Sequence, residues 1–159
     1  MNKKILSSTA IIRFQDCDPF RHLNNGRYVD YMLNAREDQV RDAYGLKIYD
    51  LAVKEQLGWV VSTSQIAFLS PALPFEKVLL ESQAIAYSPY NLMVEFRMFD
   101  EHRKQLKAFM WMDFVFIDLK KGKVTAHTPE LMDLFETAIL PVTEKDFGAR
   151  RLALKNVWS

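Results

Sequence analysis

The side chains best suited to chemistry lie close together in residues 16–28 of this 159-residue chain. Two carboxylates, one histidine and two asparagines fall between a short strand-like apolar run and a longer run with helical spacing. The first N–H groups of a helix have no partner inside the helix, and the helix dipole adds positive potential at that end. A carboxylate beside such a helix start places a base or nucleophile next to a site for an oxyanion. The segment therefore has the parts that hydrolysis of an acyl group requires.

Parts of this segment also have structural explanations. Asp18 followed by Pro19 is a common start for a turn, and Asn24 or Asn25 is a good N-cap for the helix. Taken singly, each pair favours the structural explanation. Their combination with His22 at this spacing favours a functional site.

Neighbouring residues raise two further possibilities, a thiol nucleophile and a metal site. No Cys–His–Asn arrangement accompanies Cys17, so a small buried side chain is the better explanation for this residue. Asp16, Asp18 and His22 carry metal-binding groups, but the short loop lacks a second cluster of ligands. We therefore expect Asp16 to support the loop, and we predict neither a metal nor an organic cofactor.

The elements around this segment are predicted from periodicity and turn signals. Residues 10–14 form a short strand, residues 15–23 form a loop, and a helix runs from Asn24 or Asn25 to about Tyr44. Apolar residues occupy more than one side of this helix, which indicates that it is central rather than peripheral. They recur at helical spacing and comprise Val29, Met32, Leu33, Val40, Ala43 and Tyr44, flanked by Tyr28, Tyr31 and Ala35.

Four strands and a final short helix are predicted after the long helix. The last strand is apolar on both faces, so we expect one face to pack against the helix and the other against another subunit. Thr128 and Pro129 fit the N-cap and first position of the final helix, which ends near Leu134. A single helix followed by an antiparallel sheet that wraps around it is an α+β arrangement. The predicted strands span residues 59–69, 77–87, 92–98 and 105–118.

Length and composition limit the class of protein. The chain fits one domain over 1–159, with a core over about 10–136 and a basic, peripheral tail over 140–159. The net charge of +1 gives no general attraction to nucleic acid or membranes, and no apolar run is long enough to cross a bilayer. One cysteine excludes an internal disulfide, and the N-terminus lacks the apolar core of a signal peptide, so we expect a cytoplasmic protein.

The motif residues resemble the signature of hotdog-fold acyl-CoA thioesterases of the 4-hydroxybenzoyl-CoA thioesterase type. The resemblance rests on Phe14-Gln15-Asp16-Cys17-Asp18-Pro19, followed by His22-Leu23-Asn24-Asn25 and Tyr28, and it extends over about residues 11–134. The His-x-Asn-Asn-x-x-Tyr form is similar to the branch that includes long-chain acyl-CoA thioesterases. Ser70-Pro71-Ala72, after the second predicted strand, also matches the layout of this family.

The resemblance implies a role for each motif position. The catalytic acid, a general base or a nucleophile, falls on Asp18, and the backbone N–H of Asn25 polarises the thioester carbonyl. His22 belongs to the catalytic loop, whereas Asn24 and Tyr28 are assigned to substrate binding. The fold implied is the hotdog fold, an antiparallel sheet wrapped around one long central helix.

The resemblance also implies a reaction and an assembly. The enzyme would convert acyl-CoA and water into a free acid and coenzyme A. Two subunits would pair edge to edge as a homodimer with active sites at the interface, and two dimers could form a homotetramer. Basic residues at Arg103, Lys104 and Lys107, or in the tail, could contact coenzyme A phosphates or an acidic partner. Two alternatives stay open: the same hydrolysis on an acyl carrier protein, and a non-catalytic acyl-binding hotdog dimer.

Overall fold

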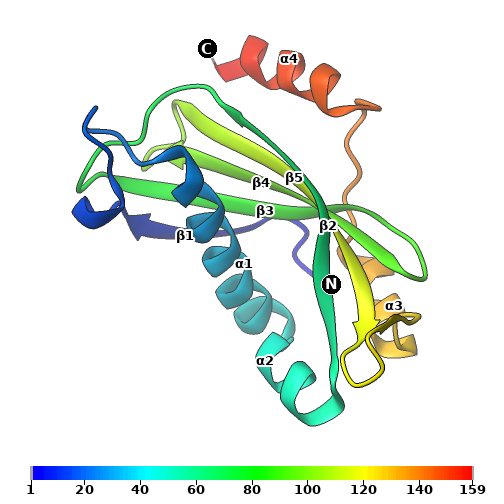
Figure 1. The fold of residues 1–159 in the computed structure, drawn as a ribbon. Coiled ribbons are helices and arrows are strands. Elements are labelled where there is room, and N and C mark those ends of the chain that lie inside the picture. The colour runs from blue at the N-terminus through cyan, green and yellow to red at the C-terminus, as the bar shows by residue number, and fades with distance from the viewer. Residues whose placement is uncertain (1, 159) are drawn as a thin grey trace.

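The computed structural model describes residues 2–158, which form one curled antiparallel sheet with a long helix against its concave side (Figure 1). The strands span Leu6–Ile11 (β1), Leu57–Phe68 (β2), Lys77–Tyr87 (β3), Asn91–Asp100 (β4), Leu106–Asp118 (β5) and Lys123–Val124 (β6). The helices span Tyr28–Tyr44 (α1), Ile48–Asp50 (α2), Pro129–Ala138 (α3) and Phe147–Trp158 (α4). The strand order is β1-β3-β4-β5-β2, and β6 pairs with β5. The predicted α+β layout is confirmed.

The long helix α1 ends where the sequence predicts, at Tyr44, but begins at Tyr28, later than the predicted Asn24 or Asn25. A 3-10 turn at Asn25–Arg27 leads into it, and Asn24 caps this turn by accepting a hydrogen bond from the Gly26 N–H at 3.0 Å. Gly45 follows the last turn with a left-handed φ of 67°. Glycine adopts this conformation without the steric cost that a Cβ would add, so the helix stops there.

The first strand lies earlier than predicted, at Leu6–Ile11 rather than over residues 10–14. Its side chains alternate between inward and outward positions, and the outward ones include Ser7 and Thr9. Because small polar residues fill these positions, the apolar pattern at residues 10–14 indicated only the end of the strand. The chain then leaves the sheet at Ile12, whose carbonyl oxygen accepts a hydrogen bond from the Phe75 N–H at 2.8 Å.

A buried apolar cluster fills the space between α1 and the concave face of the sheet. It includes Met32 of α1, Met98 of β4 and Met110 of β5, each 0% exposed. Leu131 and Phe135 of α3 join the same cluster at one end of the sheet. Burial of side chains of this size stabilises the fold by roughly 1.5–3 kcal/mol each. This packing fixes α1, and with it the loop that precedes α1.

The tail after residue 140, predicted to be peripheral, covers the outer face of the sheet (Figure 1). Its helix α4 packs Leu154 into a second apolar cluster, and Phe147 stacks on Phe109 of β5 with ring centroids 4.6 Å apart. Arg150 of α4 contacts both carboxylate oxygens of Glu95, a fully buried residue of β4, at 2.8 Å. A helix of the same chain thus covers the outer face of β5 around Phe109 and Trp111, where another subunit was expected.

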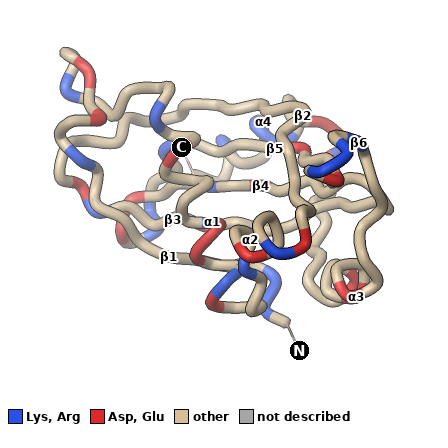
Figure 2. Tube along the Cα trace, turned by 60° about the horizontal axis from the view of Figure 1, so that its bottom comes forward, with Lys and Arg blue, Asp and Glu red and all other residues tan. Residues whose placement is uncertain are grey.

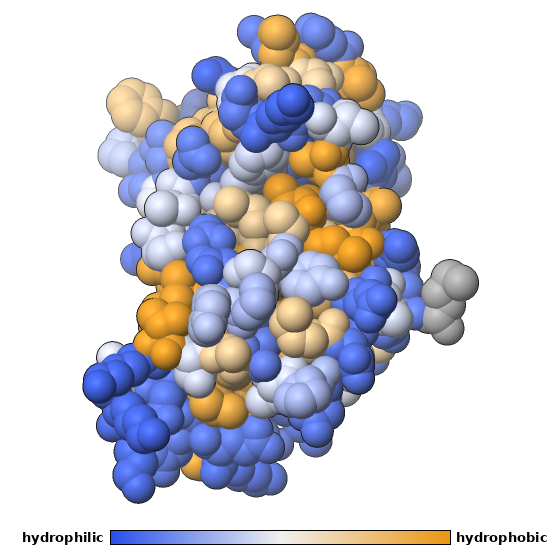
Figure 3. All heavy atoms as spheres, turned by 90° about the vertical axis from the view of Figure 1, so that its right-hand side faces the viewer, coloured by the Kyte–Doolittle hydropathy of each residue, from blue (hydrophilic) through white to orange (hydrophobic). Residues whose placement is uncertain are grey.

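Charged residues are mixed in sign over the molecule. Figure 2 shows Lys and Arg interspersed with Asp and Glu along the chain, in keeping with the net charge of +1. On the side of the molecule that carries α3, hydrophobic patches lie among hydrophilic ones, and the lower end of the view is mostly hydrophilic (Figure 3). None of the helices within residues 2–158 has the length and apolar character needed to cross a membrane.

Candidate active site

The loop between β1 and α1 is folded by hydrogen bonds of its own backbone. The Asp18 N–H donates to the His22 carbonyl at 2.9 Å, and the Arg21 N–H donates back to the Asp18 carbonyl at 3.0 Å. Arg21 takes a left-handed φ of 64°, which closes this turn. The Asn24 N–H donates to the Asp16 carbonyl at 2.9 Å. Together these bonds fold the segment of Asp18 back onto the residues that start α1.

The Asp18 carboxylate is half-buried and uses its two oxygens differently. Its Oδ1 accepts a hydrogen bond from the Phe20 N–H at 2.9 Å and a longer contact from the His22 N–H at 3.5 Å. No donor among residues 2–158 bonds to its Oδ2. One oxygen therefore fixes the orientation of the group, and the other is left for a substrate or a water molecule.

The backbone N–H of Asn25 is also left unbonded. The next two amides have acceptors, because the Gly26 N–H donates to the Asn24 side chain and the Arg27 N–H donates to the Asn24 carbonyl at 2.8 Å. The Asn25 N–H has no acceptor among residues 2–158. It lies at the start of the turn that leads into α1, where the helix dipole favours negative charge. A developing oxyanion is a fitting acceptor for it.

Both groups border one hollow with about 530 Å³ of open space. The hollow brings together four of the five predicted site residues: Asp18, His22, Asn25 and Tyr28. Asn24 does not line it, because the Asn24 side chain is turned to the helix cap. The remaining lining residues are Leu23 and the segment Phe68-Leu69-Ser70-Pro71, which follows the end of β2.

Tyr28 forms the floor of this hollow and ties it to the segment after β2. Its side chain is buried, and its ring meets the Phe68 ring edge to face at a centroid distance of 5.1 Å. The Tyr28 hydroxyl accepts a hydrogen bond from the Ala72 N–H at 3.1 Å, and the Leu23 N–H donates to the Ala72 carbonyl at 2.8 Å. Burial raises the pKa of the Tyr28 phenol, which therefore stays neutral and offers an apolar ring to a substrate.

Ser70 is a site residue that the sequence did not single out as functional. Its hydroxyl is buried at the edge of the hollow and has no hydrogen-bond partner among residues 2–158. Buried hydroxyls are nearly always hydrogen-bonded, so an unpaired one beside an open hollow is suited to a bound water or substrate. The only signal in the sequence was the position of Ser70 in the Ser-Pro-Ala segment.

Asp16 and Cys17, which lie near Asp18 in the loop, have surroundings that indicate structural rather than catalytic roles. The Tyr31 hydroxyl donates to Asp16 Oδ2 at 2.6 Å and accepts from the Arg13 N–H at 2.9 Å, so Asp16 supports the loop as predicted. Burial, followed by the charges of Asp16 and Asp18, raises the pKa of the Cys17 thiol. A protonated thiol is a poor nucleophile. Residues 2–158 contain no group of three or more His, Cys, Asp or Glu side chains placed to hold a metal ion.

The basic residues that could contact phosphates or an acidic partner are mostly engaged inside the protein. Arg103 donates to Glu81 at 2.8 Å, and its guanidinium stacks over the Phe99 ring. Lys107 is buried, with its Nζ 3.0 Å from the Glu76 carboxylate. Arg103 and Lys107 each already pair with a carboxylate, whereas Lys104 is exposed, and contact of these residues with a phosphate group stays a prediction.

Comparisons with known proteins identify the family. The family model described as "Thioesterase-like superfamily" matches residues 12–135. DHNA-CoA thioesterase from Staphylococcus aureus superposes with a TM-score of 0.77 at 16% identity, over 84% of this chain and 89% of that chain. A 1,4-dihydroxy-2-naphthoyl-CoA thioesterase from Synechocystis superposes with a TM-score of 0.73 at 16% identity, over 85% of this chain and 95% of that chain. YbaW, a probable thioesterase from Escherichia coli, superposes with a TM-score of 0.72 at 23% identity, over 85% of this chain and 99% of that chain. A search of curated proteins finds no significant match.

The family match contains every part of the site described above. It spans the loop before α1, α1 itself, the segment after β2 and the strands that carry the buried cluster. The superposed thioesterases share the curled sheet and central helix, so the predicted hotdog fold is confirmed. The chain belongs to the Thioesterase-like superfamily and is a thioester hydrolase with the hotdog fold.

Proposed function

We propose that the protein hydrolyses acyl-CoA thioesters to a free acid and coenzyme A. The observation that carries this proposal is the pair of unbonded groups on one hollow, the Asp18 Oδ2 and the Asn25 N–H. A thioester carbonyl that accepts a hydrogen bond from the Asn25 N–H would hold its carbon in the same hollow as the Asp18 carboxylate. Such an arrangement positions the reacting groups before the reaction starts.

Asp18 can act on the thioester in two ways. As a general base it takes a proton from water, whose oxygen then bonds to the carbonyl carbon. As a nucleophile it bonds to that carbon itself, which gives a mixed anhydride that water then opens. Both routes build negative charge on the carbonyl oxygen, where the Asn25 N–H and the α1 dipole stabilise it. The carbon–sulfur bond then breaks, and the thiolate of coenzyme A leaves with the electron pair and takes up a proton.

Coenzyme A is the carrier that we favour over an acyl carrier protein. An acidic carrier protein would need a basic docking surface, and Lys107 and Arg150 are already paired with carboxylates inside the protein. Lys104, Lys155 and the other exposed basic residues are mixed with acidic ones. A cytoplasmic location agrees with this substrate and with the single, unpaired Cys17.

We also propose that the working unit is a homodimer joined along β2. This strand ends the sheet and has no partner on its outer edge among residues 2–158. Its middle exposes six consecutive residues, 60–65, in an unprotected edge of the kind that pairs with another strand. Phe68 at the end of β2 lines the hollow, so pairing there would place the second subunit beside the site.

The test of the proposed reaction is a panel of short, long and aromatic acyl-CoA thioesters, with release of free thiol as the signal. We expect the wild-type protein to hydrolyse at least one member, and Asp18→Asn to lower kcat by about 10²–10⁴-fold because it removes the base or nucleophile. Acyl-CoA should still bind to Asp18→Asn, as measured by calorimetry.

The matched control is Asp30→Asn, which changes an exposed carboxylate in the first turn of α1 that pairs with Arg27 at 3.2 Å. This variant should keep wild-type turnover. Turnover by Asp18→Asn at the wild-type rate would contradict the assigned role. If no acyl-CoA is hydrolysed but acyl-CoA binds, the non-catalytic acyl-binding alternative is favoured instead.

A further inference from the structure

The buried side of α1 contains a row of residues four positions apart, and one of them is an arginine. The row consists of Tyr28, Met32, Arg36, Val40 and Tyr44. Met32 is 0% exposed and Val40 is 3% exposed, so this side of the helix faces the core. Arg36 lies in the same row and is half-buried, and an arginine on the core side of a helix normally has a charged partner. The position of Arg36 therefore needs an explanation.

Arg36 has a hydrogen bond but no counter-ion. Its Nη1 donates to the Ser82 hydroxyl at 3.1 Å, and this hydroxyl donates to Gln39 at 2.6 Å. No Asp or Glu among residues 2–158 forms an ion pair with Arg36. Burial lowers the pKa of Arg36 to about 10, so the guanidinium is still charged at neutral pH. Arg36 is half-buried and its charge is only partly hydrated, so an anion at this place would stabilise it.

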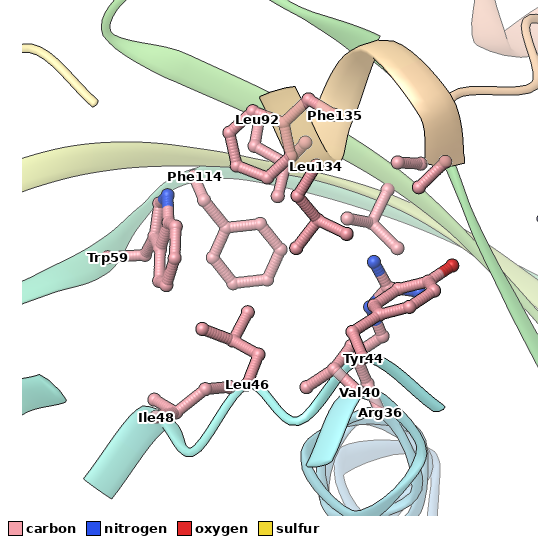
Figure 4. A pocket seen from close by; sticks show the side chains of 13 residues that line it. Arg36, Val40, Tyr44, Leu46, Ile48, Trp59, Leu92, Phe114, Leu134 and Phe135 are labelled. Atoms are coloured by element: carbon pink, nitrogen blue, oxygen red, sulfur yellow. The ribbon is translucent and has the colours of Figure 1, made fainter. Parts of the chain in front are cut away.

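The guanidinium borders an apolar cavity between the second half of α1, the concave face of the sheet and α3 (Figure 4). The cavity holds about 680 Å³ of empty space, its open mouth included. In Figure 4, Arg36 and Tyr44 lie side by side on one wall, across the cavity from Trp59 and Phe114. Arg36 is the only charged residue in the lining. The cavity thus offers a long apolar surface with one cation at its side.

This cavity is separate from the hollow at Asp18 within one chain. The two share no lining residue. Tyr28 borders the hollow and Arg36 borders the cavity, and their separation along α1 corresponds to about 12 Å of helix. Met32, which is fully buried, fills the helix face between them.

We propose that this cavity binds an apolar chain that ends in a carboxylate, with the carboxylate on Arg36. A planar guanidinium binds a carboxylate through two parallel hydrogen bonds, and this pairing is strongest where water is excluded. The apolar chain would lie against Trp59 and Phe114. An alcohol of the same length would fill the cavity but leave Arg36 without a counter-ion. Charge complementarity therefore selects the carboxylate.

Two sources can supply such a chain. One is a free fatty acid, which has the chemistry of the product of thioester hydrolysis and would occupy a site outside the catalytic hollow. The other is the far end of an acyl group whose thioester is held at the Asp18 site of a paired subunit. The second source rests on the proposed function and on the proposed homodimer, whereas the first requires neither.

Calorimetric titration with decanoate and with decanol tests the proposal without any turnover. We expect the wild-type protein to bind decanoate at least about tenfold more tightly than decanol. Arg36→Met keeps a side chain of similar reach but removes the charge, so it should bind the two ligands equally. Arg41→Met is the matched control, since it removes a charge from the exposed side of α1, where Arg41 pairs with Asp38 at 3.0 Å. This control should keep the preference for decanoate.

Three results would overturn the proposal: no binding of decanoate to the wild-type protein, equal binding of both ligands, or a preference that survives in Arg36→Met. Removal of an unpaired, half-buried charge should leave the melting temperature unchanged or higher. If Arg36→Met nevertheless fails to fold, Arg36→Gln removes the same charge with a polar side chain and is expected to lose the preference in the same way.

Hydrolysis assays then separate the two sources. Two acyl-CoA thioesters of equal length are compared, one ending in a methyl group and one in a carboxylate. If Arg36→Met loses turnover only on the carboxylate-ended thioester, the substrate supplies the anion. If neither turnover changes while decanoate binding is lost, the free acid is the ligand. Failure of the proposed function would appear as no wild-type turnover on either thioester, a result that leaves the calorimetric test intact.

Discussion

Asp18 shows how one carboxylate can be both held and available. The Phe20 N–H fixes Oδ1 at 2.9 Å, so the orientation of the group does not depend on its second oxygen. A rigid carboxylate with one open oxygen loses little conformational freedom when it meets water or an acyl carbon. The Asn25 N–H is held in the same manner, by the cap that Asn24 forms around it. The loop thus presents two fixed groups to one hollow.

Ser70 is expected to contribute to turnover without contributing to stability. Its buried hydroxyl has no partner among residues 2–158, so Ser70→Ala removes a polar group that stabilises nothing in the fold. If the hydroxyl binds the reacting water or the substrate, kcat/KM should fall by about two- to tenfold, the worth of one neutral hydrogen bond. The melting temperature should be unchanged or slightly higher. Steady-state kinetics and thermal unfolding measure the two effects.

A matched control for this variant is Ser7→Ala, which alters an exposed serine of β1 away from both the hollow and the edge of β2. It should leave kcat/KM unchanged. Equal turnover by Ser70→Ala and wild type would show that the unpaired hydroxyl plays no part in the reaction.

The sequence predicted those site residues that are close together along the chain. Asp18, His22, Asn25 and Tyr28 occupy one loop and one helix start, so local turn and cap chemistry places them together. Ser70 reaches the same hollow only through tertiary contacts such as the bond from the Ala72 N–H to Tyr28, and no periodicity reports such contacts.

The helices differ in how well they could be predicted. α1 carries a cap, a glycine stop and a continuous apolar pattern, and its extent follows from these signals. α4 mixes apolar residues with basic ones, and its apolar residues do not fall on one face, since Leu154 is buried whereas Leu152 and Val157 are exposed, so its role was missed. Arg150 and Arg151 look alike in the sequence, yet Arg150 pairs with buried Glu95 and Arg151 is exposed. The partner of Arg150 lies 55 residues away in β4, beyond the reach of local pattern.

The ion pair between α4 and the sheet is predicted to stabilise the fold. Glu95 is 0% exposed, and Arg150→Met would leave its carboxylate with only Arg97 and Trp111 as partners. Loss of one partner of a buried charge costs about 3–5 kcal/mol, and we expect about 2–3 kcal/mol here because the other donors remain. Urea unfolding measures the change, and Arg151→Met, on the exposed side of α4, should change the free energy by less than about 0.5 kcal/mol.

A double variant tests the cause of this loss. Glu95→Gln removes the charge that Arg150 neutralises, so adding it to Arg150→Met should recover part of the lost free energy of unfolding. Additive losses in the double variant would indicate that Arg150 stabilises α4 through packing rather than through the charge of Glu95.

The junction of β2 with the segment before α3 is predicted to be sensitive to acid. His127 is buried and accepts a hydrogen bond from the Trp59 indole N–H at 3.0 Å, and its other ring nitrogen lies 3.0 Å from the Ser88 carbonyl. Burial lowers the pKa of His127 below its usual 6.5, because the charged imidazolium would lose its hydration inside the protein. Below pH 6.5 the unfolded chain therefore binds a proton more readily than the folded one.

The free energy of unfolding should accordingly fall as the pH drops below 6.5 toward the folded-state pKa, and it should be steady above 6.5. The slope contributed by His127 can reach about 1.4 kcal/mol per pH unit. Urea unfolding of wild type and His127→Gln between pH 5 and 7.5 measures it, since glutamine keeps polar groups but does not titrate. Identical slopes in the two proteins would assign the acid sensitivity to other groups.

The assembly is expected to depend on the free edge of β2. Val61 is 46% exposed in the middle of this edge, and Val61→Glu would place like charges opposite each other in a symmetric pair. Light scattering should give about twice the 18.6 kDa chain mass for the wild type and the single-chain mass for the variant. Turnover should fall with the dimer if the second subunit completes the site.

Val124→Glu serves as the control, because Val124 is 58% exposed on β6, away from the edge of β2. It should leave both the mass and the turnover unchanged. A wild-type protein that is monomeric and fully active would contradict the proposed homodimer.

The cover that α4 provides to the outer face of the sheet is tethered to the sheet by the chain itself. Tethering gives α4 a fixed effective concentration at that face, which dilution of the protein does not change. A face covered by a second molecule would instead become exposed to solvent as the protein is diluted. The melting temperature would then fall as the protein concentration falls. The packing of α4 on the outer face of the sheet should therefore be equally stable in a nanomolar assay and in a concentrated stock, even where the pairing along β2 is lost on dilution.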